Sequence, residues 1–139
     1  MINGLQAFAR AVAWGTLMGA APYTVLFIIP LVAAGMGEGS IANIAILLAY
    51  PFLLSGALVL GSAVVFGLPL TVILSRSARE DGGAYGLAGL VLGALVPAAI
   101  VTYMAGEIGG DALFFAVPGA FAGLVTGVSW GRWREALNR

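Results

Sequence analysis

The sequence predicts an all-α integral membrane protein, a bundle of four transmembrane helices joined by short loops. Composition is the first observation: the chain has 139 residues, of which 61% are hydrophobic and only 9% charged. A soluble domain carries about 25% charged residues. The second is that four charge-free stretches, residues 11–37, 39–75, 82–106 and 112–131, are long enough for the roughly 20 residues that cross a hydrocarbon core. The third is the uneven distribution of arginine described below.

We expect one membrane domain, residues 1–139, with its first helix at about residues 5–33 and a kink at Pro22. The charge-free run after Arg10 is too long for the apolar core of a signal peptide, which favours an uncleaved first helix. Residues 41–74 would span about 51 Å as one helix. We therefore expect the main crossing at 51–74, with Pro51 in its first turn. Residues 41–50 are then either a short interfacial helix or an extension of that span. The third and fourth helices are expected at 84–105 and 112–131.

The charges predict the orientation of these helices. With this topology all the arginines fall on one side: Arg10, Arg76, Arg79, Arg132, Arg134 and Arg139. Loops on the other side carry only the carboxylates Glu38, Glu107 and Asp111. Cytoplasmic loops are enriched in Lys and Arg, so both termini and the middle loop are expected to face the cytoplasm. The three tryptophans lie near the same ends of the helices, as an interfacial aromatic belt requires.

Glycines spaced along the last two helices are the most specific pattern in the chain. The fourth helix has one at every fourth position, and the third helix has a shorter series; together they are Gly86, Gly89, Gly93, Gly119, Gly123, Gly127 and Gly131. Residues four apart share a helix face, and glycine lets a neighbouring backbone approach closely in lipid. We predict helix-packing seams along these faces. An internal seam filled by the third helix is favoured over an intermolecular one, although small residues are frequent in membrane helices in any case.

The charged residues outside the spans allow two further interpretations. Arg76, Arg79, Arg132 and Arg134 are candidates for contact with lipid headgroups, or they serve orientation alone. Glu38, Glu107 and Asp111 could gather at one mouth of the bundle and attract cations. The favoured interpretation is that short outer loops need some polar residue, so we predict no metal site and no cofactor.

Several function classes are disfavoured by what the chain lacks. It has no cysteine, histidine or lysine, so its hydroxyl nucleophiles have no usual activating partner, and an enzyme is not expected. No ionisable residue lies well inside a span, where proton-coupled carriers place one. Zero net charge argues against nucleic acid as a partner. We predict a non-enzymatic accessory or structural subunit; the alternative is a passive channel or carrier for a small uncharged solute.

The predicted surroundings follow from the same composition. The partners are the lipid bilayer and either a larger membrane complex or further copies of the chain. Abundant alanine, glycine and arginine without lysine suggests a GC-rich genome. A multi-pass protein of a bacterial inner membrane is therefore the expected setting.

Overall fold

The computed structural model describes residues 3–36, 40–76, 81–107 and 109–137. The regular elements within these ranges are all helical, and π-helical turns carry the symbol η. Along the chain they are α1 (Gly4–Tyr23), η1 (Thr24–Ile28), α2 (Ile29–Leu31), η2 (Val32–Met36), α3 (Ile41–Ser62), η3 (Ala63–Gly67), α4 (Leu68–Arg76), α5 (Gly82–Ala105) and α6 (Gly110–Leu137).

These elements form four long helices, each long and apolar enough to cross a membrane: Gly4–Gly35, Ile41–Arg76, Gly82–Ala105 and Gly110–Leu137. The predicted all-α class and the four apolar helices are thus confirmed. Insertion into a bilayer and the cytoplasmic position of the termini stay predictions.

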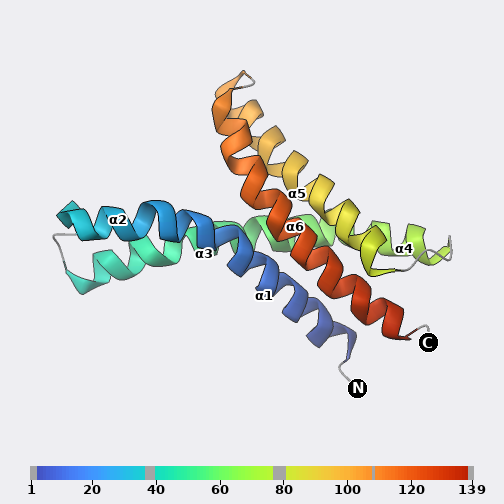
Figure 1. Ribbon diagram of the computed structural model, residues 1–139. Coiled ribbons are helices and arrows are strands. Elements are labelled where there is room, and N and C mark those ends of the chain that lie inside the picture. Colours follow the sequence, from blue (N-terminus) through green and yellow to red (C-terminus); the bar gives the residue numbers. More distant parts are fainter. Residues whose placement is uncertain (1–2, 37–39, 77–80, 108, 138–139) are drawn as a thin grey trace.

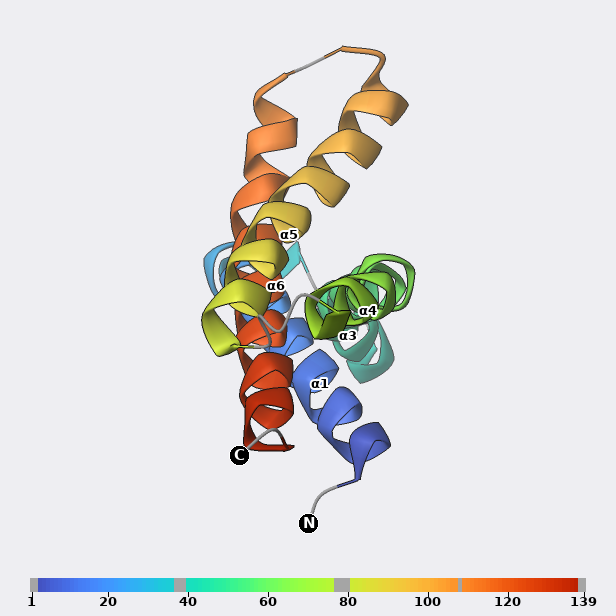
Figure 2. The same cartoon turned by 90° about the vertical axis from the view of Figure 1, so that its right-hand side faces the viewer.

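The helices are arranged as an open cross (Figures 1 and 2). Helices α5 and α6 form a hairpin and lie side by side, and α1 packs antiparallel to α6. After α1 the first helix changes direction, and α2 runs beside the first half of α3. The α3–η3–α4 helix crosses the α5–α6 pair obliquely, so that its two ends project from the bundle.

Two of the π-helical turns are explained by the prolines that follow them. The residue directly before each proline, Ile29 or Leu68, donates its N–H to the carbonyl five residues back instead of four. Proline has no N–H, and its ring crowds the carbonyl four residues before it. The wider turn makes room for the rings of Pro30 and Pro69 without breaking the helix.

The second helix begins at Ile41 and runs through Pro51, which lies in the middle of α3 and is buried. Residues 41–50 are therefore part of the same continuous helix as Pro51, and Pro51 does not occupy its first turn. The α3–η3–α4 helix as a whole has 36 residues, about 54 Å at 1.5 Å per residue. That length exceeds a hydrocarbon core of about 30 Å, so a bilayer would accommodate the helix only if it tilts strongly or extends beyond the core.

Helix ends are fixed by local hydrogen bonds. Asn3 and Gln6 form a capping box at the start of α1, and the Asp81 carboxylate accepts the Ala84 N–H at 2.7 Å at the start of α5. At the other end of α5, Gly106 has a φ of 75° and closes the helix in the left-handed conformation that favours glycine.

Candidate functional site

The centre of the α5–α6 hairpin is a reciprocal contact between glycine backbones. A Cβ atom on Gly123 would lie 2.7 Å from the Gly89 carbonyl carbon, and one on Gly89 would lie 2.8 Å from the Gly123 carbonyl carbon. Gly93 and Gly119 face each other in the same way. Real Cβ atoms essentially never come within 3.0 Å of such atoms, so only glycine fits at these positions. We call this contact the glycine seam.

The seam extends toward the start of α5 and the end of α6, where Arg132 and Arg134 lie. A Cβ on Gly131 would lie 2.8 Å from the Gly82 Cα atom, and one on Gly127 would collide with the Tyr85 carbonyl oxygen. A Cβ on Gly86 would lie 2.6 Å from the Val128 side chain. The structure thus places all seven glycines singled out from the sequence between α5 and α6 of one chain.

Two prolines leave backbone carbonyls of this hairpin without their usual helical donor, because proline has no N–H to offer the carbonyl four residues back. Pro118 leaves the Phe114 carbonyl free, and the Tyr23 hydroxyl of α1 donates to it at 3.0 Å. Pro97 does the same to the Gly93 carbonyl, whose oxygen faces Gly119 across the seam. Such close backbone approach is where Cα–H···O contacts form between helices.

A second glycine contact, which the sequence analysis did not single out, holds α1 in place. A Cβ on Gly19 would collide with the Ser55 hydroxyl, and one on Gly15 would lie 3.0 Å from the Ala122 carbonyl oxygen. Ser55 of α3 also donates its hydroxyl to the Thr16 carbonyl at 3.1 Å. Gly15 and Gly19 are four residues apart, the same spacing as in the fourth helix, and this spacing was the available signal.

Near the crossing of the helices lies an apolar groove of about 440 Å³. Pro51, Pro97 and Pro118, three of the helix-interrupting prolines, line it. Its lining includes the hydroxyl-bearing residues Ser55, Ser62 and Thr71. The Trp130 indole N–H donates to the Thr71 hydroxyl at 3.1 Å and so joins α6 to α4. None of the described residues that line the groove is charged, so its chemistry suits uncharged or apolar molecules.

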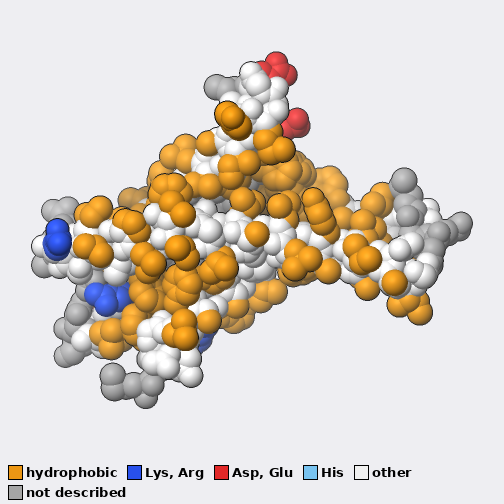
Figure 3. All heavy atoms as spheres, turned by 180° about the vertical axis from the view of Figure 1, so that it is seen from behind, with side chains coloured by type: hydrophobic (Ala, Val, Ile, Leu, Met, Phe, Trp, Pro, Cys, Tyr) orange, Lys and Arg blue, Asp and Glu red, His pale blue; other side chains and the backbone are white. Residues whose placement is uncertain are grey.

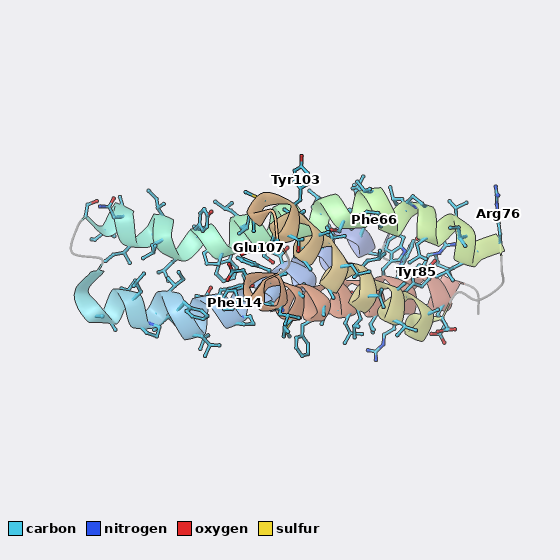
Figure 4. The ribbon with its side chains drawn as sticks, turned by 90° about the horizontal axis from the view of Figure 1, so that it is seen from above. Phe66, Arg76, Tyr85, Tyr103, Glu107 and Phe114 are labelled. Atoms are coloured by element: carbon cyan, nitrogen blue, oxygen red, sulfur yellow. The ribbon has the colours of Figure 1, made fainter. Side chains whose placement is uncertain are left out.

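Aromatic side chains close the groove beside the bend in the first helix. Tyr23 packs on Phe114 and Phe115 with ring centroids 5.1 Å and 5.8 Å apart, and Phe27 packs edge-on against Phe114 at 5.3 Å. These pairs link α1 and η1 to the start of α6. Tyr103 of α5, by contrast, points away from the helices (Figure 4) and is exposed.

The charged candidates do not form one site. Arg76 and Arg132 are exposed, and Arg134 is half-buried. The carboxylates Glu107 and Asp111 are exposed at the projecting end of the α5–α6 hairpin (Figure 3). Arg79 and Glu38 lie outside the described residues. Over the described ranges, no three His, Cys, Asp or Glu side chains gather closely enough to hold a metal ion.

Comparison with known proteins adds no assignment: no family model, curated protein or solved structure matches the chain. The chemistry of the site must therefore be judged from the residues alone. Its buried polar side chains are all hydrogen-bonded within the part of the chain that the structure describes. What the described residues offer is close helix packing around an apolar groove.

Proposed function

We propose that the protein is a non-enzymatic accessory or structural subunit of a membrane assembly. In this proposal α1, α5 and α6 form a rigid unit held by the glycine contacts, and the α3–η3–α4 helix is the face that binds a partner. The partner is either another membrane protein or a second copy of the chain. Because the glycine seam is used within the hairpin, it is not the partner surface.

The observation that carries this proposal is the poor burial of the α3–η3–α4 helix. Among the described residues of α3 and α4, Pro51 alone is buried. Large apolar side chains are exposed along the whole length of the helix, including Leu53 at 70% and Val65 at 60%. Lipid can cover such side chains, but a helix of this length gains little positional stability from lipid contact alone, because lipid tails are as apolar as leucine.

The total surface area supports a partner as well. The chain exposes 8656 Å², whereas a compact monomer of 14.1 kDa exposes about 6,700 Å². The difference, about 1,900 Å², exceeds the roughly 800 Å² that each partner contributes to a standard interface. The arms of the cross project from the bundle, and hydrophobic side chains cover much of the face shown in Figure 3.

The test is the mass of the protein in native nanodiscs, with variants on the proposed face. We expect a particle containing more than one polypeptide, and we expect Leu53→Trp to reduce it to the 14.1 kDa chain. The matched control is Leu95→Trp on α5, where the side chain is similarly exposed at 59%. A particle with a single copy of the wild-type chain and no other protein would refute the proposal.

The apolar groove favours a second candidate, a passive path for a small uncharged solute. Pro51, Pro97 and Pro118 line the groove, and Ser55 and Ser62 add hydroxyl groups to its lining. This function requires flux of an uncharged solute into liposomes, reduced when Ser62→Leu fills the wall. Absence of flux across a panel of solutes would exclude it.

A further inference from the structure

A second groove lies between α1 and α6, close to the chain termini. It encloses about 650 Å³, and Arg10, Trp14, Ser129, Arg132 and Trp133 are among the residues that line it. The helices are in direct contact at Gly15, but at Gly4 the α6 contact is made by the Trp133 ring, 3.2 Å from a Cβ position. The Trp133 indole thus lies between the two helix ends and forms part of the groove wall.

The groove brings together two positive charges from different helices. Arg10 and Arg132 are both exposed, and neither forms an ion pair or a side-chain hydrogen bond with any residue of the described ranges. Arg134, two residues after Arg132 in α6, does interact with another group. Two guanidinium groups that line one opening without a direct ion pair form a site suited to a phosphate, which accepts hydrogen bonds from planar N–H donors.

The remaining walls of the groove are apolar. Leu124, Val125 and Val128 of α6 continue from the arginines toward the middle of the helix. Trp14 is 46% exposed and lies about one turn after Arg10 along α1, and amphipathic indole rings are enriched at the interfaces of membrane proteins. A ligand that fills this groove therefore needs an anionic group at one end and a hydrocarbon segment next to it.

We propose that the groove between α1 and α6 binds one anionic phospholipid, with its phosphate between Arg10 and Arg132 and an acyl chain along Val125 and Val128. A soluble phosphate would leave the apolar wall and the tryptophans uncovered. The groove is on α1 and α6, so this binding does not depend on the partner proposed for the α3–η3–α4 helix. It also separates Arg132, which lines the groove, from Arg76, which projects from the end of α4 (Figure 4).

For the experiment, the protein is reconstituted in phosphatidylcholine nanodiscs that contain a minor fraction of phosphatidylglycerol. The protein is then released from the nanodisc in the mass spectrometer, and native mass spectrometry counts the phosphatidylglycerol molecules that stay bound to it. Removal of one arginine near a membrane surface lowers the affinity for anionic lipid about fivefold. We expect Arg10→Gln and Arg132→Gln each to reduce retention about fivefold, and the double variant to reduce it more than tenfold.

Arg76→Gln is the matched control because it removes the same charge from the same end of the helices, outside the groove; it should retain the lipid. Arg10→Lys with Arg132→Lys keeps both charges and should retain most of it, which separates binding from misfolding. Equal loss in Arg76→Gln, unchanged retention in the double Gln variant, or loss in the Lys variant equal to that in Gln would each overturn the proposal. Displacement of the lipid by inorganic phosphate at millimolar concentration would also overturn it, since that identifies a soluble anion as the ligand.

Discussion

Substitution of Gly123 by alanine is predicted to destabilise the α5–α6 hairpin. The added Cβ would lie 2.7 Å from the Gly89 carbonyl carbon, while ordinary contact begins at 3.4 Å. The helices must therefore separate by at least about 0.7 Å at this level, and a gap of that size forfeits roughly a quarter to a half of the dispersion energy of the atoms involved. Overpacking of this kind costs about 1–3 kcal/mol, which outweighs the gain in helix propensity of less than about 1 kcal/mol.

The assay is reversible unfolding in mixed micelles with increasing dodecyl sulfate, followed by tryptophan fluorescence. Gly61→Ala is the matched control, since Gly61 lies in α3 with no atom within 4 Å of its Cβ position. It makes the same chemical change at an open site, so the difference between the two variants isolates the seam. If Gly123→Ala unfolds at the same or a higher dodecyl sulfate fraction than Gly61→Ala, the glycines do not set the distance between α5 and α6.

Two further predictions concern hydrogen bonds to groups that the helices leave free. Tyr23→Phe should lower the free energy of unfolding by about 1 kcal/mol in the wild-type background but by close to nothing in the Pro118→Ala background. The reason is that the restored N–H at position 118 bonds to the Phe114 carbonyl in place of the Tyr23 hydroxyl. Equal losses in both backgrounds of this double-mutant cycle would contradict the role assigned to the Tyr23 hydroxyl. Thr71→Val removes the acceptor of the Trp130 N–H, so it should lower the unfolding midpoint, with a loss of about 1 kcal/mol in the free energy of unfolding. Thr71→Ser keeps the hydroxyl and should leave the midpoint unchanged. The same midpoint shift in both variants would assign the effect to packing and not to the hydrogen bond.

The sequence was sufficient for the all-α class and the four apolar helices, because an uncharged run of sufficient length is a direct consequence of the hydrocarbon thickness. The glycines recur with a four-residue period, which on a helix defines a face, and the sequence therefore predicted a packing face. Which helix covers that face depends on tertiary packing. The structure shows the contact between the Gly89 and Gly123 backbones, which spacing alone cannot specify.

Other features of the site depended on atoms that are far apart in the sequence. The bond from Tyr23 to the Phe114 carbonyl follows from Pro118, but only the fold shows which hydroxyl reaches that carbonyl. Gly15 and Gly19 have a readable spacing, yet their contacts with Ala122 and Ser55 require the crossing of three helices. Pro51 was expected to begin a helix because proline favours the first turn. In the structure its ring is buried in the middle of α3, where packing outweighs that preference.

We propose that protein covers the α3–η3–α4 helix in the membrane, and cross-linking from that helix tests this proposal most directly. The chain has no cysteine, so a single introduced cysteine carries a short photo-reactive group at one known place. Val65→Cys, at a position 60% exposed on η3, is compared with Leu87→Cys, at a position 66% exposed on α5. If protein covers the α3–η3–α4 helix, Val65→Cys should link the chain to a second polypeptide, while Leu87→Cys should react with lipid alone. Lipid adducts alone from both positions would contradict it.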